Sequence, residues 1–167
     1  AVRAFNELRL PLVVVGDGRD RKWLQELAGP NVTFAGRVSD AQLADYMARC
    51  RAFIFPGLED FGIAPVEAQA AGRPVIGYAA GGTLDTVVNG ETGIYFYEQT
   101  PQALAAAVRE MEMMGCNHFK PAVMRRHAER FSAQRFRQEF GAYVERKYDE
   151  HRARLRSYGV SRETPAP

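Results

Sequence analysis

The chain contains the segment Pro56-Gly57-Leu58-Glu59-Asp60-Phe61-Gly62-Ile63-Ala64-Pro65-Val66-Glu67, which lies between an apolar run, Ala52–Phe55, and a helical one that ends at Ala71. This order predicts a strand, a polar turn and then a helix. Pro65 suits the first helical position, where its missing N–H costs nothing, and Gly72 suits the position just past the helix end. The segment therefore predicts a strand-turn-helix unit of an α/β protein.

Two carboxylates, Glu59 and Glu67, stand at either side of this turn. The predicted unit places Glu67 in the first helical turn and Glu59 in the loop above the strand end, where open α/β sheets bind ligands. Helix N-termini favour phosphate, and carboxylates accept hydrogen bonds from hydroxyls. A nucleotide sugar offers both groups. The alternative is that Glu59 is a solvated loop residue and Glu67 an acid that suits the helix dipole.

Strand and helix signals alternate along the chain, which predicts an α/β fold with a Rossmann-like, mainly parallel sheet and flanking helices. Strands are predicted over Pro11–Gly16, Val32–Ala35, Ala52–Phe55, Pro74–Tyr78 and Gly93–Phe96. Helices are predicted over Ala1–Leu8, Asp20–Leu27, Ser39 or Asp40 to Arg49, Ala64–Ala71, Leu84–Val88, Pro101–Met114, Pro121–Arg130 and Ala133–Arg156. A Rossmann-type half opens with a strand, whereas this chain opens with a helix, so a first strand is expected to be missing or the sheet smaller.

The predicted domain organisation has three parts. Residues 1–115 form a nucleotide-sugar-binding domain, residues 116–157 form C-terminal helices that pack on it, and residues 158–167 form a disordered tail. The C-terminal helices carry apolar residues at helical spacing, which predicts a stripe that faces inward. This stripe consists of Phe131, Phe136, Phe140, Val144 and Tyr148.

Composition excludes several classes of protein. The formal net charge is only +2 over 167 residues, without the strong positive charge that is typical of nucleic-acid-binding proteins. No apolar run approaches the roughly 18 residues of a membrane span. Cys50 and Cys116 show no CxxC spacing and no signal peptide opens the chain, which favours a cytoplasmic location, with Cys50 as a small core residue.

Basic residues gather in the C-terminal part. Residues 120–157 hold eleven lysines and arginines against five acidic residues. Such helices could contact an anionic membrane peripherally at the inner face, at about 1 kcal/mol per basic residue near the surface. The alternative is an ordinary solvated face.

Other motifs carry less information. Gly16-Asp17-Gly18 could be a phosphate loop, but Arg21 stands where the dinucleotide fingerprint has a third glycine, and a tight strand-to-helix turn explains the pattern equally well. The three histidines show no metal-ligand spacing, so no metal site is expected.

Several short motifs, in their order and spacing, resemble the C-terminal, donor-binding domain of GT-B retaining glycosyltransferases of family 4. They are Ala4-Phe5, Val15-Gly16-Asp17-Gly18, Phe34-Ala35-Gly36-Arg37-Val38, the Glu59-to-Glu67 segment, Ala71-Gly72-Arg73-Pro74-Val75-Ile76, Gly81-Gly82, Asn89-Gly90 with Gly93, and Phe131-Ser132 with Phe136. The resemblance covers residues 1–157 and is nearest to bacterial GDP-mannose-dependent mannosyltransferases of polysaccharide assembly.

The resemblance implies roles for matching residues. Glu59 is the catalytic residue and bonds the donor hexose, whereas Glu67 binds the ribose. Phe61, Gly62 and Ile63 supply backbone contacts to sugar and phosphates. These roles agree with the chemistry of the residues, because a carboxylate accepts from two adjacent hydroxyls and Gly62 allows close backbone approach.

The loop Arg37-Val38-Ser39-Asp40 lies where the family places the nucleobase. Asp40 could accept from the two N–H donors of guanine, whereas uracil has only one of them. The alternative role for Asp40 is a helix cap.

Departures from the family pattern limit what this chain is expected to do alone. The family carries an Arg and a Lys on the loop after the first strand, and no such pair precedes Ala1. The acceptor-binding N-terminal domain is also absent. The chain is therefore expected to be the donor half of a larger hexosyltransferase, with no cofactor and no metal, and inactive by itself.

The donor is expected to be GDP-mannose in preference to UDP-glucose, in polysaccharide or glycolipid assembly. A second hypothesis is a non-catalytic nucleotide-binding or regulatory module, which would explain the missing basic pair. A third, an NAD-dependent oxidoreductase, is disfavoured by the absent third glycine.

Overall fold

The computed structural model describes residues 1–115 and 117–157. These residues fall into two compact units, Ala1–Glu129 and a second that begins at Arg130. The first unit contains α1 (Val2–Leu8), β1 (Leu12–Val15), α2 (Arg21–Leu27), β2 (Val32–Gly36), α3 (Asp40–Arg49), β3 (Phe53–Phe55), α4 (Ile63–Ala70), β4 (Val75–Tyr78), α5 (Thr83–Thr86), β5 (Gly93–Phe96), α6 (Pro101–Met114) and α7 (Pro121–Glu129). The predicted tail, residues 158–167, lies outside the described residues.

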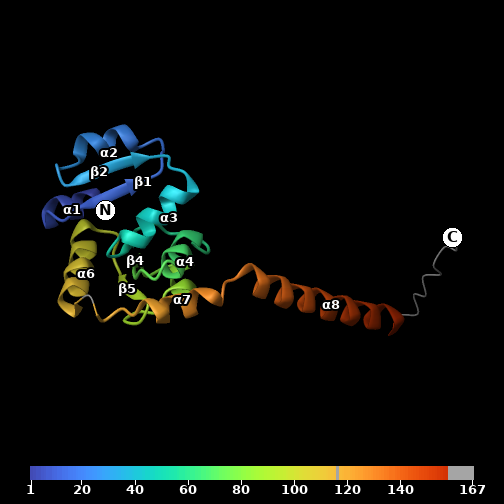
Figure 1. Ribbon diagram of the computed structural model, residues 1–167. Helices are drawn as coiled ribbons and strands as arrows, with labels where there is room; N and C mark the ends of the chain where they lie inside the picture. The colour runs from blue at the N-terminus through green and yellow to red at the C-terminus, as the bar shows by residue number, and fades with distance from the viewer. Residues whose placement is uncertain (116, 158–167) are drawn as a thin grey trace. The chain divides into compact units, whose positions relative to one another are not determined.

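The strands of the first unit all pair in parallel (Figure 1). Leu12 of β1 lies opposite Val32 of β2, Phe53 of β3 opposite Val75 of β4, and Val75 opposite Gly93 of β5. The predicted α/β, mainly parallel architecture is confirmed. The strands form two sheets rather than one, however, with the orders β1-β2 and β3-β4-β5, and no described strand pairs with both β1 and β3.

One hydrophobic core nevertheless holds both sheets. Ile76 and Ile94 of the inner strands are 0% and 2% exposed, and Leu104 of α6 is equally buried. Phe5 of α1 belongs to the same cluster, and Leu12 of β1 packs against its edge. Helices α1 and α6 therefore bridge the two sheets with apolar side chains.

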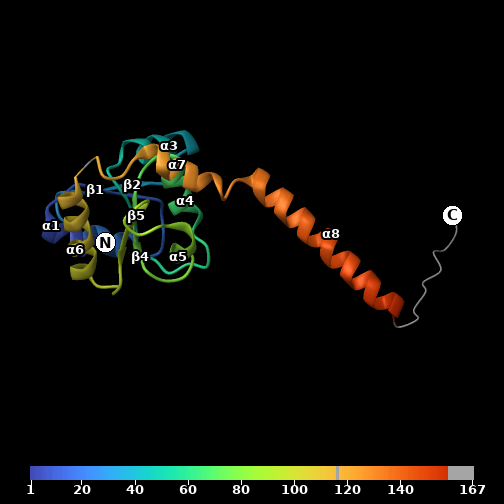
Figure 2. The ribbon, with the colours of Figure 1, turned by 90° about the horizontal axis from the view of Figure 1, so that it is seen from below.

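Helix α7 belongs to the first unit, whereas the sequence analysis groups it with the C-terminal helices that pack on the domain. Met124 and Ala128 of α7 are buried, and the helix packs beside α4 (Figure 2). A Cβ on Gly72, whose φ is +80°, would lie 2.9 Å from the Cβ of Pro121, so the glycine lets the two segments approach closely. The packing of α7 extends the domain to Glu129.

The second unit contains helix α8, Ala133–Ser157. Phe136, Phe140, Val144 and Tyr148 of the predicted inward stripe are all exposed, and none of the α8 residues is buried. Within the described part of the second unit, these four side chains are therefore uncovered. Their spacing shows that the helix has an apolar side, but spacing does not determine whether other residues cover that side.

Within the described residues, no helix has both the length and the apolar character that a membrane crossing requires.

Candidate functional site

The loop from Pro56 to Gly62 joins the carboxyl end of β3 to the start of α4, as the sequence predicted. Gly62 caps α4 with a left-handed backbone (φ +80°). A Cβ there would lie 3.3 Å from Phe55 and 3.4 Å from Pro65, so glycine suits the position by backbone conformation and by space. The loop thus ends in a tight turn directly before the helix.

A second turn, Gly81-Gly82, holds this loop in place. The Gly82 N–H donates to the Glu59 carbonyl at 2.8 Å. A Cβ on Gly81 would lie 2.4 Å from the Glu59 carbonyl oxygen, and one on Gly82 would lie 2.2 Å from that of Phe61. The two backbones therefore meet only because both turn residues are glycines. The sequence identified Gly81-Gly82 as a turn and a family motif, but not as the support of the Glu59 loop.

The start of the loop has its own anchor. The Gln99 side-chain amide, after β5, donates to the Pro56 carbonyl at 3.0 Å. This contact spans 43 positions, so no local sequence signal could have revealed it.

Both predicted carboxylates are available to a ligand. Glu59 and Glu67 are exposed, and neither carboxylate has a hydrogen bond or ion pair within residues 1–115 and 117–157. Carboxylates without protein partners can accept from the hydroxyl groups of a sugar.

The position of Glu67 in the helix differs from the prediction. Because α4 begins at Ile63, Pro65 is the third helical residue rather than the first, and Glu67 follows the first turn, which contains no acidic residue. The effect of the helix dipole is concentrated in the first turn. The helix dipole therefore stabilises the Glu67 carboxylate only weakly and does not by itself explain an acidic residue here.

The start of α4 offers free N–H groups. No side chain caps the helix at Gly62. The first four N–H groups of a helix have no partner within it, so those of Ile63 and Ala64 can donate to a ligand. The Phe61 and Ile63 side chains beside them are exposed, the latter at 68%.

The other predicted residues lie at the carboxyl end of the β1-β2 sheet. Gly16, with φ +112°, donates its N–H to Gly36 at 2.7 Å, so the β1 and β2 ends are joined there. Gly16 and Gly18 are exposed, and a Cβ on either would meet nothing within 4 Å. Close packing therefore does not explain either glycine. At position 16 the positive φ, which residues with a side chain rarely adopt, explains why a glycine is present.

The structure identifies the cap of α3. Ser39 caps the helix through a capping box with Gln42, and Asp40 is the first helical residue. Asp40 is therefore not the cap, and its exposed carboxylate is free for another role. Arg37 is exposed and Val38 half-buried beside it.

The predicted residues thus form two groups, each at the carboxyl end of one sheet. Glu59, Phe61, Gly62, Ile63 and Glu67 lie after β3, and the Gly16–Gly18 and Arg37–Asp40 loops lie after β1 and β2. In the described part of the chain, no cluster of three or more His, Cys, Asp or Glu residues could hold a metal ion. Cys50 follows α3 and is a member of neither group, and burial raises the pKa of its thiol.

Comparison with known proteins identifies the family. The sequence model for glycosyl transferases group 1 matches residues 1–130. The chain is 42% identical over 86 residues to a GDP-mannose-dependent α-mannosyltransferase of Corynebacterium glutamicum, a match that covers 51% of this chain and 21% of that protein. It is 32% identical over 106 residues to a glycogen synthase of Mycobacterium tuberculosis, over 60% of this chain and 26% of that one.

Solved structures show the same fold. The Anabaena protein HepE in complex with UDP and glucose superposes with a TM-score of 0.71 at 24% identity, over 85% of this chain and 42% of its own. A glycosyltransferase from Rickettsia africae gives 0.75 at 22% identity, over 86% and 42%. The chain thus spans less than half the length of these proteins. Because the family model covers more than three quarters of it, the chain belongs to the group 1 glycosyl transferases, as its sequence motifs predicted.

Proposed function

We propose that this chain is the donor-binding part of a retaining hexosyltransferase that uses a nucleoside diphosphate hexose in polysaccharide or glycolipid assembly. The observation that carries the proposal is the Glu59 loop, held by Gly81-Gly82 beside the uncapped start of α4. The acceptor hydroxyl would come from a second domain, since the chain spans 42% of the HepE chain.

Each group of the donor has a complementary group in this site. The Ile63 and Ala64 N–H groups would bind the diphosphate, Glu67 the ribose hydroxyls and Glu59, as the catalytic residue, those of the hexose. In the reaction the bond from the anomeric carbon to the phosphate oxygen breaks, and the acceptor oxygen bonds the same carbon on the same face. The acceptor proton passes to the leaving phosphate oxygen, and the Ile63 and Ala64 N–H groups stabilise the charge that develops on the diphosphate.

We further propose GDP-mannose in preference to UDP-glucose. Asp40 supports this choice, because Ser39 caps α3 and leaves the Asp40 carboxylate for the N1–H and N2–H₂ donors of guanine. The relative in Corynebacterium glutamicum is named for its dependence on GDP-mannose, which also supports it.

A thermal-shift titration with GDP, UDP, ADP and NAD tests the proposal. A ligand at 100 times its dissociation constant adds about 2.7 kcal/mol of stability. We expect the largest shift with GDP, and its reduction to the UDP value in Asp40→Asn. A shift with NAD alone would contradict a nucleotide-sugar site, and equal shifts with GDP and UDP would contradict the guanine preference.

We also propose that α8 contacts an anionic membrane surface. Its exposed aromatic residues accompany seven basic residues against four acidic ones, and Arg152 lies over the Tyr148 ring at 5.7 Å. Aromatic side chains with a polar tip favour the membrane interface. This contact would bring the site to a lipid-linked acceptor.

Vesicle binding measures this contact. Changing Arg152 and Arg154 to glutamine should weaken binding to phosphatidylserine-containing vesicles about 30-fold, since each basic residue contributes about 1 kcal/mol. The matched control changes the exposed Arg19 and Arg109 to glutamine and should bind as the wild type does. Absence of wild-type binding at low salt would contradict the membrane contact.

A further inference from the structure

Helix α5 connects the Glu59 loop to a group of polar side chains in the interior of the first unit. At the start of α5, Gly82 donates its N–H to the Glu59 carbonyl at 2.8 Å. At its end, the Thr86 carbonyl accepts from the Gln69 side-chain amide of α4 at 2.7 Å and from His127 Nε2–H of α7 at 3.2 Å. This four-residue helix therefore contacts the loop at one end and is held by α4 and α7 at the other.

Thr86 links the two ends of α5. Its hydroxyl donates to the Gly82 carbonyl at 2.8 Å, and its N–H donates to the same oxygen at 3.0 Å. The Thr86 side chain is completely buried, so its hydrogen bond lies in a medium of low dielectric constant, where it is stronger than in water. A series of hydrogen bonds thus runs from Gln69 through Thr86 and Gly82 to Glu59.

Gln69 is completely buried, but half of its amide has no partner. Its Nε2 donates to the Pro65 and Thr86 carbonyls at 3.1 and 2.7 Å, which fixes the orientation of the amide. Within the described residues, Oε1 is buried and accepts no hydrogen bond. An unpaired buried acceptor destabilises a fold, and the Thr86 carbonyl would keep the bond from His127 without Gln69. The stability of the fold is therefore a weak explanation for a glutamine at this position.

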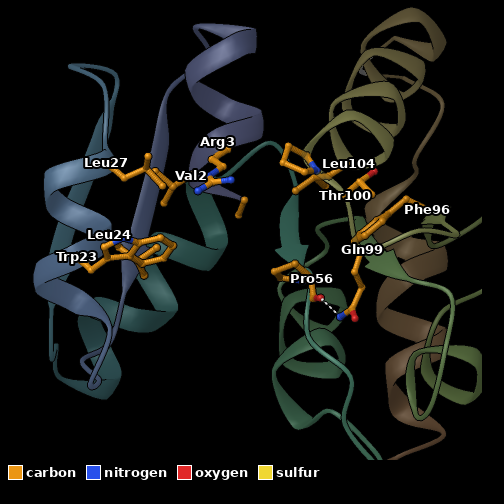
Figure 3. Close-up of a pocket in the computed structure, with 12 residues that line it drawn as sticks. Val2, Arg3, Trp23, Leu24, Leu27, Pro56, Phe96, Gln99, Thr100 and Leu104 are labelled. Atoms are coloured by element: carbon orange, nitrogen blue, oxygen red, sulfur yellow. Dashed lines mark hydrogen bonds between the residues drawn. The ribbon is translucent and has the colours of Figure 1, made fainter.

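The beginning of the Glu59 loop is held separately. The Gln99 side-chain amide donates to the Pro56 carbonyl at 3.0 Å (Figure 3). This bond fixes where the loop starts, whereas the backbone at Glu59 is held by Gly82. The position of Gly82 depends in turn on α5, because its carbonyl is bonded twice by Thr86.

We propose that Gln69 is a positioning residue for Glu59: by holding the end of α5, it sets the place of Gly82 and hence the direction in which the Glu59 side chain leaves the loop. The consequence for the donor rests on the proposed function, in which Glu59 binds the hexose. Loss of the Gln69 amide should therefore weaken recognition of the hexose. Recognition of the nucleotide, which is assigned to Glu67 and the Arg37–Asp40 loop, should be spared.

Three variants of the chain test the proposal. Gln69→Met keeps an unbranched side chain of similar length and removes the amide. Thr86→Val keeps the branched shape and interrupts the same series at the Gly82 carbonyl, so the test does not depend on a single variant. The matched control is Thr92→Val. Thr92 is also completely buried and accepts from the Val88 N–H at 2.9 Å, but this bond is outside the series.

Two measurements are made on the wild type and on each variant. Amide hydrogen exchange at Gly82 reports the hydrogen bond to Glu59 in the chain without ligand. Titrations followed by amide spectra give the dissociation constants of GDP-mannose and, separately, of GDP, which lacks the hexose. The ratio of the two constants isolates the contribution of the hexose from that of the nucleotide.

We expect Gln69→Met and Thr86→Val to speed exchange at Gly82 by about tenfold and to weaken GDP-mannose binding by about tenfold. GDP binding should change by less than about twofold. Thr92→Val should lower the melting temperature without either effect. Equal loss of GDP and GDP-mannose affinity would overturn the proposal, because a merely structural role predicts that result. Faster exchange at Gly82 with unchanged GDP-mannose affinity would also overturn it.

Failure of the proposed function would give a different result. If the wild type bound neither GDP-mannose nor GDP, the donor site itself would be contradicted. Exchange at Gly82 would then still decide whether Gln69 positions the loop, since it is measured without ligand. Faster exchange in the Gln69 and Thr86 variants than in the Thr92 variant would support that role, and equal exchange in all three would overturn it.

Discussion

Replacing Gly82 by alanine should lower the melting temperature of the first unit by about 10 °C and abolish nucleotide binding. The added Cβ would lie 2.2 to 2.4 Å from the carbonyl oxygen, Cα and carbonyl carbon of Phe61. These are backbone atoms, so no side-chain rotation relieves the contact and the Glu59 loop must move. Overpacking of this kind costs about 3 kcal/mol, at the upper end of its usual range.

A matched control distinguishes the contact from a general effect of losing a glycine. Gly57 lies in the same loop, but a Cβ there would meet nothing within 4 Å, and its φ is not positive. Gly57→Ala should therefore change stability by less than about 0.5 kcal/mol. Calorimetry of both variants measures the difference. Equal stability of Gly82→Ala and Gly57→Ala would contradict the role of Gly82 as the support of the loop.

Replacing Glu67 by glutamine should weaken donor binding by about 10- to 100-fold while leaving stability unchanged. A hydrogen bond to a charged group contributes about 1.5–3 kcal/mol, and every 1.4 kcal/mol corresponds to tenfold in affinity. Glu67 is exposed and has no partner among the described residues, so its neutral isostere should fold as the wild type does. Isothermal titration with GDP-mannose measures the change.

The control for Glu67 is Glu91, an exposed carboxylate outside the proposed site. Glu91→Gln should bind the donor with wild-type affinity. Equal loss of affinity in the Glu67 and Glu91 variants would contradict the proposed ribose contact, because the loss would then come from the change in net charge.

The sequence predicted the elements well because their signals are local. The strand Gly93–Phe96 and the helix Pro101–Met114 have the predicted ends. The structure shows why the helix begins there, because Thr100 caps it and Pro101 is its first residue. The start of α4 was less predictable. Gly62 has a left-handed backbone and caps the helix, so α4 begins at Ile63. Glu67 consequently lies beyond the first turn.

Long-range features could not be derived in the same way. The contact between Gly82 and the Glu59 loop depends on the approach of two backbones, which no side-chain pattern encodes. The division into two sheets depends on which strands are adjacent, and strand periodicity indicates a face rather than a partner. For the same reason, the spacing of Phe136 and Phe140 predicts an apolar side of α8 but not the residues that would cover it.

The most direct measurement is a titration of the isotope-labelled 167-residue chain with GDP-mannose and, separately, UDP-glucose, followed by amide correlation spectra. Such spectra detect millimolar binding, so a weakened site is still visible. We expect GDP-mannose to shift the amides of Phe61, Gly62, Ile63 and Val38, and Glu67→Gln to reduce these shifts. Spectra without shifts in the Glu59–Glu67 segment at saturating donor, or with shifts centred elsewhere, would contradict a nucleotide-sugar site at the carboxyl end of β3.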